Sequence, residues 1–257
     1  MVLSPAKSLD FTAAPEGAPL TTPVLLDDIG TLARVAKRLS AADLKRLMSI
    51  SDSLANLNRE RFQAFDAACE DGLQAAFAFN GDVYAGLRAR NLDRASLLWA
   101  QDHVRILSGL YGVLRPLDAM QPYRLEMGVR LKTPRGSNLY EFWGDRIART
   151  LAADLAGHAE PVLVNLASNE YFQAVDRSAL NVPVLSIRFL EERDGAAKVI
   201  SFFAKKARGL MARFAIENRI DRIEGLKDFT VEGYGFRPDL SGDGEWTFSR
   251  VQAAAAA

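Results

Sequence analysis

Apolar residues in the first hundred positions recur at helical spacing and divide into four segments. The spacing predicts a helix over residues 25–36. Ser40, with Asp43 three residues later, is close to a capping box and predicts the start of a second helix. Ser51 predicts the start of a third helix, and residues 93–105 predict a fourth. The N-terminal half is therefore expected to be mainly helical.

Short apolar runs bounded by turn-forming residues predict strands, most of them in the second half. They cover residues 2–4, 161–166, 182–190, 198–203 and 245–248. Asp194-Gly195 lies between two of these runs and is typical of a hairpin turn. The last run follows a glycine-rich turn and is expected at an edge of the sheet.

The order of these elements indicates one mixed fold. No linker rich in Gly, Ser or Pro divides the chain, although residues 11–23 hold three of the ten prolines and predict an irregular arm. We expect an α/β (mixed α+β) fold over residues 1–257, a single compact domain with a mixed sheet surrounded by helices. Residues 253–257 are expected to form a disordered tail.

Composition excludes several classes of protein. The chain has 32 positive and 32 negative side chains, so binding of a polyanion would require a local, positively charged surface. A single cysteine, Cys69, and two histidines without ligand spacing argue against a metal site, and we expect no cofactor. The absence of a signal-like or membrane-spanning stretch predicts a cytoplasmic protein without a membrane partner, most economically a monomer.

The most informative stretch is the basic segment 106–135. With Arg105, it carries six positive and two negative side chains. Gly109 and Gly112 resemble the hairpin of a helix-hairpin-helix element, in which backbone N–H groups approach a phosphate. A tight turn with a buried core is the structural alternative. The expected DNA contacts in this segment are Ser108, Gly109, Tyr111, Gly112, Arg115 and Arg124.

A second basic segment spans residues 198–222, with seven positive and two negative side chains. A helix starting near Ser201 would bury one apolar stripe and turn a basic stripe outward. A solvated face is the alternative to a polyanion-binding surface. The phosphate contacts expected here are Lys205, Lys206, Arg208 and Arg213, on a cleft shared with the first segment.

Four residues are candidates for chemistry if they converge on one pocket. Lys7 stands between two serines after a predicted strand, and an amine there can bind phosphate or act as a nucleophile. Asp82 opens a short helix, and Glu170 follows the strand over 161–166, where α/β sheets place functional groups. Together with Arg115 they define an alternative function, an enzyme that modifies nucleic acid or nucleotides.

Several motifs resemble the YaaA family of bacterial peroxide-stress proteins, over residues 2 to 248. They are SPAKSLD (4–10), FNGDVYAGL (79–87), LSGLYGVLRPLDAMQPYRLEMG (107–128), LYEFWGD (139–145), NLASNEYF (165–172) and ISFFAKKARGLMARFAIEN (200–218).

The resemblance implies a cytoplasmic protein that protects cells during hydrogen-peroxide stress by limiting damage from unincorporated iron. It also implies an unusual α/β fold and binding of double-stranded DNA through a positively charged cleft with a helix-hairpin-helix element. The residues themselves place that element around Ser108–Gly112. The resemblance carries no reaction over to this chain.

Overall fold

The computed structural model describes residues 1–67, 71–193 and 196–251. Cys69, the predicted turn at Asp194-Gly195 and the predicted tail over 253–257 lie outside the described residues. A mixed sheet runs through the molecule in the order β11-β12-β9-β8-β1-β5-β6, with β10 paired to β9. These strands are β1 Val2–Leu3, β5 Arg105–Ser108, β6 Gly112–Leu114, β8 Leu163–Leu166, β9 Val184–Arg193, β10 Ala196–Lys198, β11 Gly235–Phe236 and β12 Glu245–Val251.

The five inner strands, β12, β9, β8, β1 and β5, are parallel, whereas β6, β10 and β11 pair antiparallel at the margins. Parallel strands need both faces covered, and every residue of β1 and β8 is indeed buried. Two small sheets join β2 Ser8–Leu9 to β4 Phe79–Asn80, and β3 Leu73–Gln74 to β7 Ala119–Met120. The predicted mixed α/β fold is confirmed.

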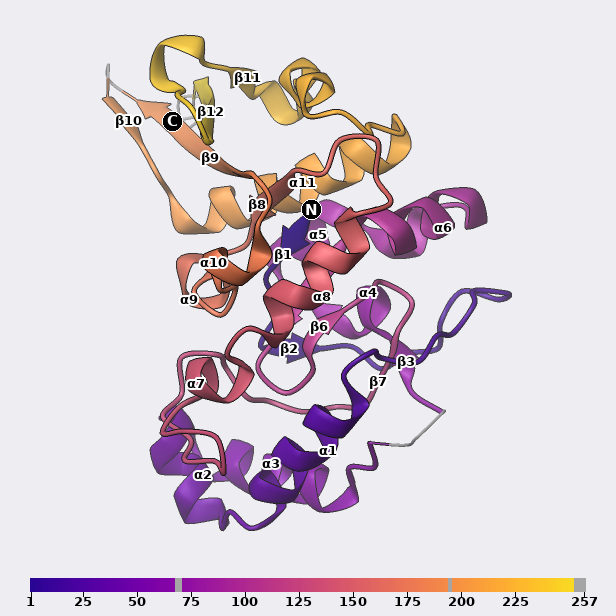
Figure 1. Cartoon of the computed structure of the whole chain (residues 1–257), viewed down its shortest axis with the longest axis vertical. Helices are drawn as coiled ribbons and strands as arrows, with labels where there is room; N and C mark the ends of the chain where they lie inside the picture. Colours follow the sequence, from indigo (N-terminus) through magenta and orange to yellow (C-terminus); the bar gives the residue numbers. More distant parts are fainter. Residues whose placement is uncertain (68–70, 194–195, 252–257) are drawn as a thin grey trace, which may run out of the picture.

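Helices pack around the sheet, and they gather unevenly. They are α1 Leu26–Lys37, α2 Ala41–Met48, α3 Asp52–Ala64, α4 Ala75–Ala78, α5 Asp82–Leu87, α6 Arg94–His103, α7 Leu139–Trp143, α8 Arg146–Leu155, α9 Asn169–Phe172, α10 Arg177–Leu180 and α11 Ser201–Glu217. Short 3-10 turns cover Ala89–Asn91, Ile223–Asp228, Val231–Gly233 and Pro238–Leu240. In Figure 1, α1, α2 and α3 lie at one end of the molecule and β9, β11 and β12 at the other, with β1 and β8 between them.

Local sequence signals set several boundaries. Ser40 caps α2 by accepting a hydrogen bond from the Asp43 backbone N–H, and Asp43 accepts from the Ser40 N–H in return, so the capping box is complete. Ser51 caps α3 and Asp93 caps α6 in the same manner. The predicted helices near 25–36, 40 and 51 are therefore confirmed.

Two strand predictions are corrected. The strand expected over 198–203 ends at Lys198, and α11 begins at Ser201 because its apolar face packs against α5 and β9. The strand expected at an edge over 245–248 is β12, which lies between β11 and β9. Its Phe248 joins a buried aromatic cluster with Phe189 and Phe229, and this packing holds β12 inside the sheet.

Candidate nucleic-acid interface and adjoining polar hollow

The segments that carry Lys7 and Glu170, a loop after β1 and the start of α9 after β8, leave the sheet side by side. They follow β1 and β8, which are neighbouring parallel strands, so both segments emerge at the same edge. The Ser4 hydroxyl oxygen accepts a hydrogen bond from the Ser168 backbone N–H at 2.8 Å and joins the two segments. Such an edge is where open α/β sheets collect functional groups.

Lys7 and Glu170 line one hollow of about 490 Å³, called here the edge hollow. The Lys7 Nζ lies 3.2 Å from Oε1 of Glu126, and Arg124 donates a hydrogen bond to that same oxygen at 3.0 Å. On the other side, the Gly128 N–H donates to Oε1 of Glu170 at 3.1 Å. The edge hollow therefore presents an amine together with two carboxylates.

Buried tyrosines pack behind the residues that line the edge hollow. The Tyr84 hydroxyl donates to the Ser4 carbonyl oxygen at 3.1 Å, and the Tyr123 and Ser108 hydroxyls bond to each other at 2.5 Å. Burial raises the pKa of Tyr84, Tyr123 and Tyr171, because an ionised phenol would lose its hydration. These neutral phenols form a fixed floor behind the loops of the edge hollow.

Next to the edge hollow lies a groove of about 630 Å³ between the end of α1, helix α2 and the chain that follows β7. Arg46 and Arg130 line both spaces, and Arg38 and Lys132 line the groove alone. Within the described part of the chain, exposed Arg38, Arg130 and Lys132 have no carboxylate partner, whereas Arg46 pairs with Asp43 at 2.5 Å. We call this space the basic groove. Its unpaired cations suit an anionic ligand.

A tight helix pair borders these spaces. Only three residues, Ser49 to Ser51, connect α2 to α3, and the two helices pack on each other. Ser49 adopts a left-handed backbone with φ of 53°, which reverses the chain, and it lines the edge hollow. Lys45 beside this turn pairs with Asp52 at 2.8 Å. The turn therefore stands next to the cations of the basic groove.

The predicted helix-hairpin-helix position at Ser108–Gly112 is wrong. This segment is the β-hairpin between β5 and β6, and Ser108, Gly109, Tyr111 and Gly112 are all buried. A Cβ on Gly109 would lie 2.1 Å from the Leu125 carbonyl oxygen. The glycine is therefore required by a close approach within the protein. The segment forms the alternative expected from the sequence, a tight turn with a buried core.

The basic residues predicted on α11 are mostly engaged within the protein. Lys206 pairs with Glu232 at 2.5 Å, and Arg213 pairs with Glu217 at 2.7 Å. Arg208 is half-buried, its Nε has no hydrogen-bond partner among the described residues, and burial lowers its pKa. Of these four residues, Lys205 is the one that is exposed.

Arg115 and Asp82 lie apart from the edge hollow's lining. Arg115 pairs with buried Asp118 at 2.8 Å and lines a separate hollow beside Asp102 and Asp154. Asp82 begins α5, and the preceding Gly81 packs against the loop of Lys7. Of the four proposed catalytic candidates, the structure thus brings Lys7 and Glu170 to one hollow.

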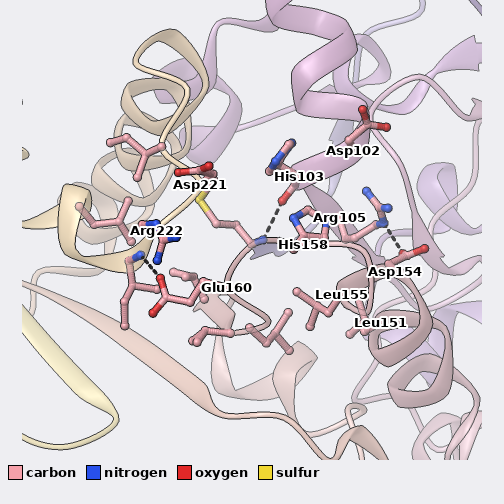
Figure 2. Close-up of a pocket in the computed structure, with 17 residues that line it drawn as sticks. Asp102, His103, Arg105, Leu151, Asp154, Leu155, His158, Glu160, Asp221 and Arg222 are labelled. Carbon is pink, nitrogen blue, oxygen red and sulfur yellow. Dashed lines mark hydrogen bonds and ion pairs between the residues drawn. The ribbon is translucent and has the colours of Figure 1, made fainter.

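The two basic segments do meet, but at their ends and in acidic surroundings. Figure 2 shows this meeting point, where Arg105 and Arg222 stand among four carboxylates. Arg105 is bound to Asp154 at 2.6 Å. Burial lowers the pKa of His103 and His158, so neither adds positive charge near neutral pH. This hollow is unsuited to phosphate. The carboxylates are Asp102, Asp154, Glu160 and Asp221.

The groove's cations were not among the expected contacts. Arg130 and Lys132 belong to the basic segment 106–135, but Arg38 and Arg46 stand on helices whose charge pattern is that of any solvated face. The sequence signal for this part of the groove was the pair of serine caps, Ser40 and Ser51, which predicts two short helices joined by a tight turn. Within residues 1–67, 71–193 and 196–251, no group of three or more His, Cys, Asp or Glu is arranged to hold a metal ion.

Together these features define a class: a mixed α/β protein with a polar hollow at the carboxyl edge of its parallel strands and, beside it, a groove lined by cationic and apolar side chains. The sequence profile of the family described as "Peroxide stress protein YaaA" matches residues 1–240. The chain therefore belongs to the YaaA family of peroxide stress proteins, as the sequence motifs predicted.

Bacterial relatives are similar along nearly their whole length. A UPF0246 protein of Phenylobacterium zucineum is 66% identical over 252 residues, covering 98% of this chain and 95% of the relative. A UPF0246 protein of Caulobacter vibrioides is 65% identical, covering 98% and 99%. One from Maricaulis maris is 54% identical over 256 residues, covering 100% and 97%. None of the helices in the described residues is long and apolar enough to span a membrane.

Proposed function

We propose that this peroxide stress protein acts by binding double-stranded DNA in the basic groove. The observation that carries the proposal is the row of exposed cations, Arg38, Arg130 and Lys132, that lack carboxylate partners among the described residues. On a chain with zero net charge, several other arginines are ion-paired within the protein, among them Arg105, Arg115 and Arg213. Cations left unpaired along one groove favour a polyanion, because each phosphate contact releases a condensed counterion.

The shape of the site favours double-stranded DNA over a small anion as the ligand. The basic groove and the edge hollow are neighbours that share Arg46 and Arg130 in their linings, so cationic side chains are spread over an extended surface. The tight turn of the α2–α3 pair stands at this surface and exposes Ser49 and Ser51. Contacts to a backbone of repeating phosphates would be independent of base sequence.

Replacing Arg38, Arg130 and Lys132 together with alanine is expected to weaken duplex binding on the order of 100-fold near physiological salt. The slope of log affinity against log salt should become shallower by about 2.7, since each lost phosphate contact removes about 0.9. Fluorescence anisotropy with a labelled duplex at several salt concentrations measures both quantities.

A matched control removes the same charge elsewhere. Arg177, Lys198 and Lys205 are also exposed, and their joint replacement with alanine should leave the affinity and the salt slope near those of the unmodified protein. If the control weakens binding as much as the groove variant, the phosphates contact α11 and its surroundings. If neither variant changes binding, the groove is not the interface.

We further propose that DNA binding limits iron-driven damage by displacing the metal. Ferrous ions associate with phosphates as counterions, and a protein that neutralises phosphates releases them. Hydroxyl radicals formed from peroxide would then arise away from the strand.

Nicking of supercoiled plasmid by Fe(II) and hydrogen peroxide should fall when the protein is added in saturating amounts. The groove variant should lose this protection and the control triple should keep it; equal protection by both would contradict the displacement.

A further inference from the structure

Lys7 presents its amine to a space that adjoins the basic groove. Its side chain is 68% exposed, and its Nζ stands 3.2 Å from Glu126, whose side chain is only 12% exposed. Arg46 and Arg130 line the same hollow and also line the groove. An incoming ligand thus meets an amine, an adjacent carboxylate and two guanidinium groups in one place.

The amine's loop is held from several sides. The Ser4 hydroxyl accepts the Ser168 N–H, and the Ser4 carbonyl accepts the Tyr84 hydroxyl. Tyr84 is buried on α5, and Ser168 precedes Glu170 in the neighbouring segment. These bonds fix the Lys7 loop against the start of α9, which carries Glu170, a support that an ordinary solvated lysine does not need.

Glu170 supplies a second carboxylate on the opposite wall. Its Oε1 accepts a hydrogen bond from the Gly128 N–H, and this bond orients the side chain. The residue is exposed and lines the hollow together with Lys7. The two carboxylates thus have different environments. Glu126 lies against the amine, and Glu170 faces the open space.

We propose that Lys7 is the nucleophile of a lyase acting on base-free deoxyribose in DNA, an activity that rests on the proposed DNA binding. The ring-opened form of this sugar has an aldehyde at C1′, an acidic C–H at C2′ and a phosphate leaving group at C3′. A primary amine forms an imine with the aldehyde, one carboxylate accepts the amine's proton, and the second serves as the base for elimination. Arg46 and Arg130 are placed for the flanking phosphates.

The steps balance without an added oxidant or reductant. Lys7 loses a proton to Glu126, and its Nζ bonds to C1′. The aldehyde oxygen takes one proton from Nζ and a second from Glu126, and it leaves as water to give the protonated imine and the ionised Glu126. Glu170 removes a proton from C2′, and that electron pair, through the imine, breaks the C3′–O bond and expels the phosphate. Water then hydrolyses the imine, which frees Lys7 and leaves an unsaturated aldehyde on one strand end.

Borohydride trapping tests the first step. The probe is a labelled duplex with one base-free site, incubated with the full chain and sodium borohydride, which reduces the imine to a stable amine. We expect a covalent adduct mapped to Lys7 by peptide mass spectrometry, and its loss to background in Lys7→Ala. Lys227→Ala is the matched control because Lys227 is also ion-paired, to Glu224 at 2.6 Å, and it should keep the adduct. An adduct that persists in Lys7→Ala overturns the proposal.

A second variant separates the two steps. Glu170→Gln should still form the trapped adduct but cleave the strand about 100-fold more slowly, because only the elimination needs this base. Equal cleavage by Glu170→Gln and the unmodified protein would remove Glu170 from the reaction. Anisotropy on intact duplex distinguishes the two proposals. Normal binding without any adduct refutes the lyase alone, whereas absent binding refutes the proposed function.

Discussion

Replacing Gly209 with alanine is expected to destabilise the protein by about 3 kcal/mol, although alanine is the better helix former. Gly209 lies inside α11 where this helix crosses α5. A Cβ there would stand 1.8 Å from the Val83 carbonyl oxygen and 2.8 Å from the Leu87 nitrogen. Both neighbours are backbone atoms of α5, so the clash cannot be relieved by a side-chain rotation.

Thermal unfolding followed by circular dichroism measures this effect, and a melting temperature about 8 °C lower is expected for a chain of this size. Gly157→Ala is the control, because a Cβ at Gly157 meets nothing within 4 Å. That variant should change stability by no more than about 0.5 kcal/mol. A Gly209→Ala protein as stable as the control would show that the two helices can separate at little cost.

The crossing matters for the candidate site. Helix α5 carries Tyr84, whose hydroxyl holds the Ser4 carbonyl, and Gly81 before it packs against the loop of Lys7. Separation of α5 from α11 would therefore shift the floor of the edge hollow. We expect Gly209→Ala to lose imine trapping more than it loses duplex binding, since the basic groove is built from α1, α2 and the chain after β7.

Raising the pH above about 10 is expected to unfold the protein steeply, because buried Tyr84, Tyr123 and Tyr171 must ionise. Burial raises the pKa of each phenol in the folded state above its value in the unfolded chain. Their contribution to stability is complete below the unfolded pKa and is lost as pH rises toward the folded one. Each tyrosine contributes a slope of about 1.4 kcal/mol per pH unit.

Urea unfolding at pH 9, 10 and 11, with phenolate absorbance recorded alongside, measures this slope. Tyr84→Phe should lower stability at neutral pH by about 1 kcal/mol through the lost bond to Ser4, and it should reduce the alkaline slope by about 1.4 kcal/mol per unit. An unchanged slope in Tyr84→Phe, or ionisation of these phenols in a protein that keeps its native circular dichroism, would contradict the expectation.

Much of the local structure followed from short-range chemistry. The serine at position 40 and the acid at 43 set the start of α2 wherever the helix packs, since the capping bonds join residues three apart. Short runs made mainly of apolar residues identified β1 and β8 as buried strands in the same way. The placement of Lys7 and Glu170 after such strands was also visible in the sequence.

Other features depended on distant partners. Phe202 and Phe203 look like part of a strand, yet they belong to α11, because the residues that follow bury their apolar face on α5. The glycines at 109 and 112 look like a phosphate-binding turn, yet Leu125 and Trp143 occupy the space that a phosphate would need. The sequence pattern does not show which distant residue packs into the space that a glycine leaves by lacking a side chain.

By itself, the sequence determined the family, the mixed α/β class, the capped helices and the two segments that carry an amine and a carboxylate. Tertiary structure alone decided which cations are available. Arg105, Lys206 and Arg250 look free in sequence but pair with carboxylates 49, 26 and 59 positions away. Arg38 and Arg130, 92 positions apart, line one groove and have no carboxylate partner among the described residues. Charge is a property of a residue, but the neutralisation of that charge depends on distances that only the folded chain sets.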